Sequence, residues 1–189
     1  NVLGKEYTSA APLININSNE SINGAIDIET KKAGVTEVIR FNGTSTRISV
    51  PCPSNWNDSF SFVVWAMPSK LTRGNMSMIC KEGYHTQLGL NDKNFFFSAW
   101  SKDRKQRKQL KSTTKPQKEV WYFLAGVYNA GENSMSLYVD GKPVDSAILD
   151  HKLYANTGGR KKPLHIGCAN PKSPANPCYF NGCMSHIRV

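Results

Sequence analysis

Basic side chains crowd into one stretch of the sequence, residues 102–118, where they can bind anions. Only Asp103 opposes them there, and three more cations follow at residues 160–162. Such a cluster attracts sulfated or acidic glycans, phosphates or an acidic protein surface. The alternative is a solvated loop that keeps a basic protein soluble. We expect both groups to lie between strands. The candidate anion-binding residues are Lys102, Arg104, Lys105, Arg107, Lys108, Lys111, Arg160, Lys161 and Lys162.

The overall charge also favours an anionic partner. The chain has 24 Lys and Arg against 14 Asp and Glu, a formal net charge of +10 at pH 7. Nucleic acid is not the expected partner, because no aromatic residue interrupts the basic stretch to stack on a base and no nucleic-acid-binding motif is present. No run approaches the roughly 18 to 20 apolar residues of a membrane span, so no transmembrane segment is expected.

Two tryptophans have the neighbours that a sugar site needs, which are hydrogen-bonding side chains beside a flat ring. Trp56 lies in the polar stretch PSNWNDS, and Trp100 would share one strand face with Phe96 and Ser98. Packing in the core is the alternative for both rings, since large aromatic side chains are mostly buried. The candidate ligand-binding residues are Trp56, Asn57, Trp100, Tyr84 and His85.

The cysteines cannot all pair within the chain, because there are five of them. Cys168 with Cys178, or Cys178 with Cys183, would each close a short loop near the C-terminus. A secreted protein would favour such a bond. The possible disulfide therefore involves two of these three residues, and the sequence leaves the choice open.

Cysteine and histidine also occur at the two-residue spacing of zinc-binding pairs, as His165 with Cys168 and Cys183 with His186. Both pairs fall in predicted strands, where residues three apart point to opposite faces and cannot hold one ion without a turn between them. We expect no zinc site and no cofactor. A structural calcium ion stays compatible with the sequence, because backbone carbonyls can supply most of its ligands.

A predicted β-meander from Glu119 to Val144 organises the chain around these residues. Residues 120–128 are apolar on both faces, which is typical of a strand covered on both sides. After a loop containing Gly131, residues 134–140 alternate between apolar and polar, which predicts a half-buried strand. Asp140-Gly141 then suits a two-residue type I′ turn into a third strand. Such a meander needs a second sheet to cover it.

The remaining patterns also predict strands. VIRFNGTSTRISV is predicted to form a hairpin of two short strands about an Asn42-Gly43 turn, SFSFVVWAM a buried central strand, and residues 91–94 a hairpin connection. No helical period of ten or more residues appears. A length of 189 residues with 39% hydrophobic residues predicts a single all-β domain.

The order of these elements resembles the laminin-G-like, concanavalin A-like lectin/glucanase superfamily, the pentraxin-related jelly rolls. The resemblance is strongest where Trp65 precedes the meander and where Phe180, Gly182, Ile187 and Arg188 close the chain in a Phe-x-Gly-x-x-x-x-Ile-Arg pattern. It covers roughly residues 36–189 and implies a two-sheet antiparallel jelly-roll sandwich there. Residues 1–35 are then an N-terminal arm with weak strands, packed on the sandwich or leading into it.

The resemblance also shows where family chemistry is missing. Related glycosidases place Glu-x-Asp-x-Glu on one strand, whereas here Ala25 precedes Asp27 and Glu29. Laminin-type members bind calcium through an aspartate just before the strand equivalent to residues 86–90, where this chain has Tyr84 and His85. We therefore expect no catalytic residues and no laminin-type calcium site.

The expected function is a non-catalytic, lectin-like carbohydrate-binding module of a larger secreted or cell-surface protein, favouring acidic or sulfated glycans. The alternatives are an adhesion or structural module that binds an extracellular protein, and an accessory domain of a glycoside hydrolase. Salt separates the first two, because binding through the basic residues should weaken steeply as salt rises.

Overall fold

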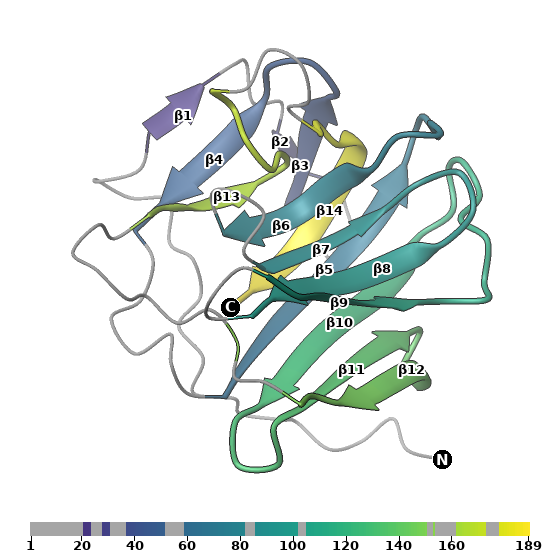
Figure 1. Cartoon of the computed structure of the whole chain (residues 1–189). Coiled ribbons are helices and arrows are strands. Elements are labelled where there is room, and N and C mark those ends of the chain that lie inside the picture. The colour runs from purple at the N-terminus through teal and green to yellow at the C-terminus, as the bar shows by residue number, and fades with distance from the viewer. Residues whose placement is uncertain are drawn as a thin grey trace.

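In the computed structural model of the protein, the described residues form two antiparallel sheets of seven strands each, which face one another (Figure 1). The structure describes residues 21–23, 28–30, 37–51, 59–81, 86–101, 105–150, 153, 162–172 and 178–189. The predicted jelly-roll sandwich is confirmed. Within the ranges above, no helix occurs that is long and apolar enough to cross a membrane.

Sheet I runs from the short strand β1 at one edge to the basic strand β9 at the other. Its strands are, in spatial order, β1 (Ser21–Asn23), β4 (Arg47–Val50), β13 (Leu164–Ile166), β6 (Met76–Lys81), β7 (Thr86–Leu90), β8 (Phe95–Trp100) and β9 (Arg107–Lys111).

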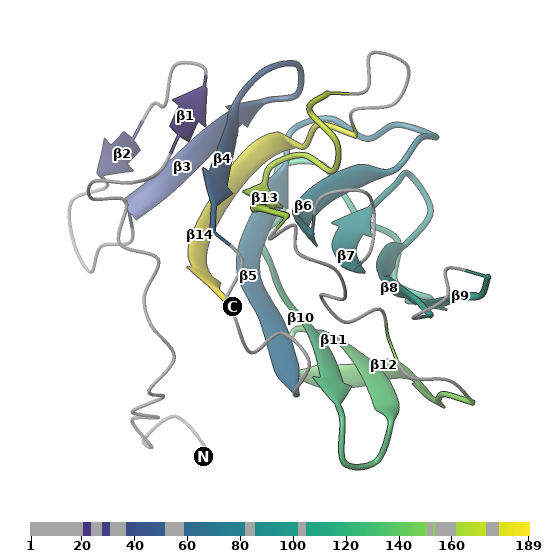
Figure 2. The same ribbon diagram turned by 60° about the vertical axis from the view of Figure 1, so that its left-hand side comes forward.

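Sheet II runs from β12 to β2, and its β12 edge lies against the β9 edge of sheet I. Its strands are, in spatial order, β12 (Lys142–Ile148), β11 (Ser134–Val139), β10 (Tyr122–Asn129), β5 (Phe60–Pro68), β14 (Asn181–Arg188), β3 (Glu37–Asn42) and β2 (Ile28–Thr30). Figure 2 shows β1 and β2 together at the opposite end of the sandwich. They extend both sheets, and the domain boundary at residue 36 stays a prediction.

The core between the sheets is built largely from alternate residues of the central strands of each sheet. Phe95, Phe97 and Ala99 of β8 face inward, and Phe62 and Phe97 pack edge to face with ring centroids 6.1 Å apart. Burying an aromatic side chain removes a large apolar area from water, so this aromatic cluster contributes much of the stability. The residues that alternate with them point to the outer faces of the two sheets.

The meander is confirmed as β10, β11 and β12, which pair in sequence order. Asp140 and Gly141 both have positive φ, 51° and 76°, as the type I′ turn requires. The Asp140 carboxylate also accepts a hydrogen bond of 2.9 Å from the N–H of Phe123. The hairpin between β7 and β8 is confirmed too, with its ends joined through Asn91 and Asn94.

The predicted hairpin about Asn42-Gly43 is wrong, because β3 lies in sheet II and β4 in sheet I. The Asn42 carboxamide oxygen accepts the N–H groups of Thr44, Ser45 and Thr46 at 2.9 to 3.0 Å. These local bonds hold the turn without a ladder between the flanking strands. The Asn-Gly signal therefore predicts a turn correctly, but the two strands pair with distant partners.

The expectation of full burial for β5 and β10 is also wrong. Strand β5 is central, between β10 and β14, and its inner face is buried as predicted. On the outer face of sheet II, however, Trp65 is 40% exposed and its ring packs on Phe123 at a centroid distance of 5.5 Å. Just before β10, Val120 and Trp121 are exposed as well. An apolar sequence on both faces of a strand thus does not guarantee two covering layers.

Tyr128 makes the stability of the fold sensitive to alkaline pH. Burial raises the pKa of its phenol above the ordinary 10.0, and a hydrogen bond with the backbone of Leu153 opposes the rise. The folded state therefore favours the protonated phenol. Its stabilising contribution is complete below pH 10.0 and is lost as the pH rises through the raised pKa.

We therefore expect the unfolding free energy of Tyr128→Phe to fall less than that of the parent as the pH rises above 10.0. At neutral pH the variant should lose about 1 kcal/mol, because the phenol no longer donates its bond of 3.0 Å to the Asn133 side chain. Urea unfolding from neutral to alkaline pH measures both effects. If the unfolding free energy of the variant falls as steeply above pH 10.0 as that of the parent, Tyr128 is not the residue responsible for the alkaline loss of stability.

Candidate functional site

The middle of the basic stretch forms the edge strand β9 and is not the loop that its charges suggest. Leu110 pairs with Phe97 and is buried in the core, whereas the flanking Lys108 and Lys111 are exposed. Leu110 packs this edge strand against the core, although most of its other residues are exposed to solvent. Charged residues are frequent on such edge strands. The strand therefore holds its cations in fixed directions.

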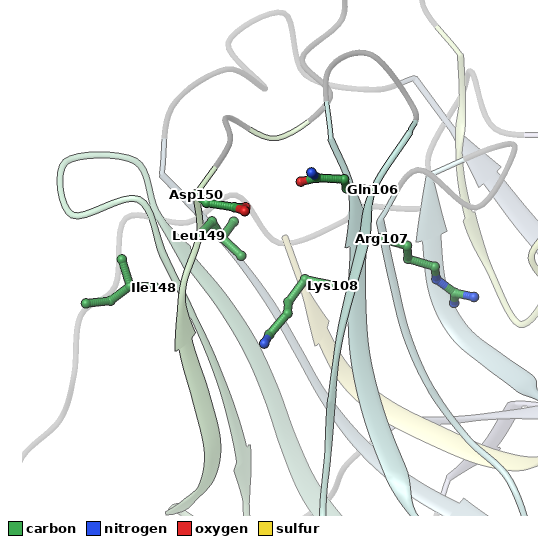
Figure 3. Close-up of a pocket in the computed structure, with 6 residues that line it drawn as sticks. All are labelled: Gln106, Arg107, Lys108, Ile148, Leu149 and Asp150. Carbon is green, nitrogen blue, oxygen red and sulfur yellow. The ribbon is translucent and has the colours of Figure 1, made fainter.

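Alternate residues of β9 point to two different surfaces. Arg107, paired with Trp100, belongs to the outer face of sheet I, and Lys108 lies on the side of β9 that faces residues 148–150 (Figure 3). The backbone N–H of Lys111 donates a hydrogen bond of 2.9 Å to the Asp145 carboxylate on β12. This bond ties the two sheet edges together beside both cations.

The outer face of sheet I carries a polar row beneath the exposed Arg107. The Arg107 guanidinium donates a hydrogen bond of 2.9 Å to the hydroxyl of Ser98, which is fully buried. Gln87 pairs directly with Ser98 and is 1% exposed, and within the described part of the chain neither atom of its amide has a hydrogen-bond partner. A buried polar group without a partner costs about 1 to 3 kcal/mol, so this amide favours the presence of a water or ligand hydroxyl.

Trp100 borders the same row, as predicted. It is half-buried and lies on the outer face together with Phe96 and Ser98. Phe96 itself is fully buried against Gly89, where an added Cβ would approach the ring to 2.6 Å. Trp100 therefore supplies the accessible flat ring of this face. We define the outer-face site as Gln87, Ser98, Trp100 and Arg107.

A cleft of about 380 Å³ opens on the other side of β9, between this strand and the residues that end β12. We call it the edge cleft, and it is lined by Gln106, Arg107, Lys108, Ile148, Leu149 and Asp150. In Figure 3 the side chains of Gln106 and Lys108 extend to the side of β9 on which residues 148–150 lie, with Gln106 directed toward Asp150, whereas Arg107 points away. The edge cleft thus combines one cation, one carboxylate, one amide and an apolar wall.

Several predicted residues fall outside the described ranges, so their part in a site stays a prediction. Of those that are described, Lys105, Arg107, Lys108 and Lys111 gather on or beside β9, and Lys162 lies just before β13. The predicted residues outside the described ranges are Trp56, Asn57, Tyr84, His85, Lys102, Arg104, Arg160 and Lys161.

Sequence reasoning missed Gln87 and Gln106, and it interpreted Asp150 as a turn-forming residue at the rim of the sandwich. Gln87 could have been found, because the hairpin over residues 91–94 fixes the register that sets it opposite Ser98. Gln106 and Asp150 carry no such signal, since they meet only where the edges of the two sheets converge.

Four buried cysteines lie in the described part of the structure. Cys178 belongs to a small apolar cluster with Cys80 and Ala169, while Cys168 lies just after β13 and Cys183 on β14. The Cys80 thiol donates a 3.2 Å hydrogen bond to the carbonyl of Lys81. The disulfide choice among Cys168, Cys178 and Cys183 stays a prediction.

Four aspartates, Asp92, Asp140, Asp145 and Asp150, are the carboxylates expected at the rim of the sandwich that could bind calcium. Asp140 and Asp145 each accept a backbone N–H, as expected of residues that hold turns and edges. Among the described residues, no three acidic, cysteine or histidine side chains come together. A structural calcium ion stays a prediction.

Two facing antiparallel sheets define the class of antiparallel jelly-roll sandwiches. Residues 42–189 match the family described as the concanavalin A-like lectin/glucanases superfamily. The chain belongs to this superfamily, which confirms the resemblance. No curated protein sequence matches the chain significantly.

Solved structures show the same fold at low sequence identity. Domain 4 of AbnA, a GH43 extracellular arabinanase from Geobacillus stearothermophilus solved with arabinotriose, has a TM-score of 0.66 and 19% identity. The similarity covers 89% of this chain and 80% of that domain. At this identity the likeness establishes the fold alone.

Two further neighbours are longer than this chain. A candidate carbohydrate-binding protein from Bacteroides ovatus has a TM-score of 0.63 and 15% identity over 80% of this chain, which spans 42% of its length. The ligand binding domain of botulinum neurotoxin serotype D, solved with N-acetylneuraminic acid, has a TM-score of 0.59 and 14% identity over 89% of this chain, which spans 46% of its length.

Proposed function

We propose that this domain is a non-catalytic carbohydrate-binding module and that it binds glycan at the outer-face site. The observation that carries the proposal is the exposed Arg107, anchored on the buried Ser98 beside the half-buried ring of Trp100. A flat ring next to a fixed, forked donor suits a sugar, because the ring stacks on the C–H face while the guanidinium bonds the hydroxyls.

The cations of β9 extend the proposal to acidic or sulfated glycans. Lys105, Arg107, Lys108 and Lys111 are all exposed, and they occupy one strand and the residues just before it. Such a cluster raises the local concentration of an anionic ligand and speeds its association. The superfamily and the carbohydrate-binding neighbours support a module of a secreted or cell-surface protein. One of those neighbours is a domain of an arabinanase, so an accessory domain of a glycoside hydrolase stays an alternative.

Replacing Trp100 by alanine tests the site. We expect Trp100→Ala to weaken binding to the glycans that the parent domain selects on an array by about tenfold or more, since aromatic anchors dominate small interfaces. Trp65→Ala is the matched control, because Trp65 is partly exposed on the outer face of the other sheet. Its affinity should stay within about twofold of the parent. Equal affinities for the Trp100 variant and the parent would refute the site.

A protein-binding module is the second candidate, and the outer face of sheet II favours it. Trp65, Val120 and Trp121 are exposed large apolar residues on or near that face. Aromatic and aliphatic anchors of this kind are typical of protein interfaces. Binding through this face should persist at high salt and fail in Trp65→Ala, whereas binding through β9 should weaken as salt rises.

A further inference from the structure

The edge cleft has the size and the mixed lining of a site for a single sugar unit. Its volume of about 380 Å³ lies at the lower end of the range for small-molecule sites. One wall comes from sheet I, at Gln106 and Lys108, and the other from the end of sheet II, at residues 148–150. We propose that the edge cleft binds a carboxylated sugar, with its acid group on Lys108.

The apolar wall of the cleft is held in place by the backbone of Leu149. Its N–H donates a 2.8 Å hydrogen bond to the carbonyl of Asn133, and its carbonyl accepts one of 2.8 Å from the Asn133 side chain. Leu149 is itself almost fully buried, whereas the adjacent Ile148 is 83% exposed. A wall fixed in this way loses little conformational freedom when a ligand binds. It offers an apolar surface to the C–H face of a sugar ring.

The charged residues that line the cleft determine how many acid groups a bound sugar can carry. Lys108 lines the cleft from β9, Arg107 points away from it, and Asp150 lies on the opposite wall (Figure 3). One positive and one negative group suit a ligand with a single acid group and several hydroxyls, because the Asp150 carboxylate can accept hydrogen bonds that the hydroxyls donate. A densely sulfated chain would place further negative charge beside Asp150 and would be repelled. The cleft therefore favours a monocarboxylated sugar over a polysulfated one.

This inference rests on the proposed carbohydrate binding but names a second contact surface, on the opposite side of β9 from Trp100. The probe is an oligouronate together with its carboxyl-reduced, neutral counterpart, and binding is measured by calorimetry at about 0.15 M ionic strength. We expect the parent domain to bind the acid form at least about fivefold more tightly than the neutral form.

Lys108→Gln should reduce that preference to about twofold or less, the part that the remaining cations of β9 supply. Lys115→Gln is the matched control, because it removes the same charge from an exposed residue of the basic stretch that does not line the cleft. It should retain the preference. Asp150→Asn should raise affinity for a polysulfated oligosaccharide by about fivefold. Thermal unfolding of each variant confirms that it is folded.

Three outcomes would overturn the inference. If Lys108→Gln and Lys115→Gln lose equal parts of the preference for the acid form, the preference comes from the overall positive charge of the basic stretch and not from the edge cleft. Equal affinity of the parent domain for both forms, with binding still dependent on Trp100, would refute the cleft while leaving the proposed function intact. Binding of neither form, together with an empty glycan array, would refute both.

Discussion

Replacing Gly182 by alanine is expected to lower the free energy of unfolding by about 3 kcal/mol or more. Gly182 has φ +147°, a conformation that residues with a side chain rarely adopt. An added Cβ would collide with the carbonyl oxygen of Met67 and lie 2.9 Å from backbone atoms of Pro68 and Ser69. These are backbone atoms of β5 and the residue after it, so they cannot rotate away.

The pairing of β14 with β5 makes this clash hard to relieve. Gly182 pairs with Pro68, and the N–H of Ser69 donates a 3.0 Å hydrogen bond to the carbonyl of Asn181. Moving β14 outward would break this bond and the adjacent ladder. Thermal unfolding should show a midpoint lowered by about 6 to 12 °C.

Gly74→Ala is the control for this variant. Its Cβ would meet nothing within 4 Å, and its φ is not in the left-handed region. It should leave the unfolding midpoint within about 2 °C of the parent. A Gly182→Ala protein as stable as the Gly74→Ala protein would contradict the close approach of β14 and β5.

Gly182 also shows what the sequence could predict. The Phe-x-Gly spacing at the C-terminus supported the family resemblance, but the spacing alone gives no reason for the glycine. The reason is the contact with Met67, more than a hundred positions earlier. Local signals predicted local geometry well, as in the turn at Asp140-Gly141. The sheet to which each strand belongs depends on distant partners, and there the prediction for β3 and β4 failed.

In the candidate site, too, local sequence patterns predicted some features, whereas others depend on residues far apart in the sequence. Alternation along β8 placed Trp100 and Ser98 on one face, and the structure agrees. Charge density in the basic stretch concealed the period of two that makes β9 a strand, because only Leu110 marks its inner face. The edge cleft joins residues 106–108 to residues 148–150, which no local pattern connects. Its existence therefore had to come from the structure.

Strand β9 connects the two proposed contact surfaces. Because successive residues of a strand point to opposite faces, Arg107 serves the outer-face site and Lys108 the edge cleft. The register of β9 against β8, fixed by Leu110 opposite Phe97, sets this division. A slip by one residue would exchange the two cations and expose Leu110. The apolar core thus determines on which side of β9 each of the two cations lies.

Gly126 and Phe97 are expected to be strongly coupled in stability. Gly126 lies on the inner face of β10, and an added Cβ there would come within 2.5 Å of the Phe97 ring. The ring cannot move aside freely, because Phe62 and Phe60 pack on it at centroid distances of 6.1 and 6.4 Å. Gly126→Ala should therefore cost about 1 to 3 kcal/mol through overpacking.

The double variant tests whether this contact is the cause. Phe97→Leu alone should cost about 1 to 2 kcal/mol for the lost aromatic volume. Combined with Gly126→Ala, the total should fall short of the sum of the single costs by about 1 kcal/mol or more, because the smaller side chain makes room for the new methyl group. Urea unfolding of all four proteins measures the coupling. Gly131→Ala, in an exposed loop, is the control, and its cost in unfolding free energy should simply add to that of Phe97→Leu. If the costs of Gly126→Ala and Phe97→Leu are also additive, the contact with the Phe97 ring is not the cause, and the effect of Gly126→Ala lies in the β10 backbone.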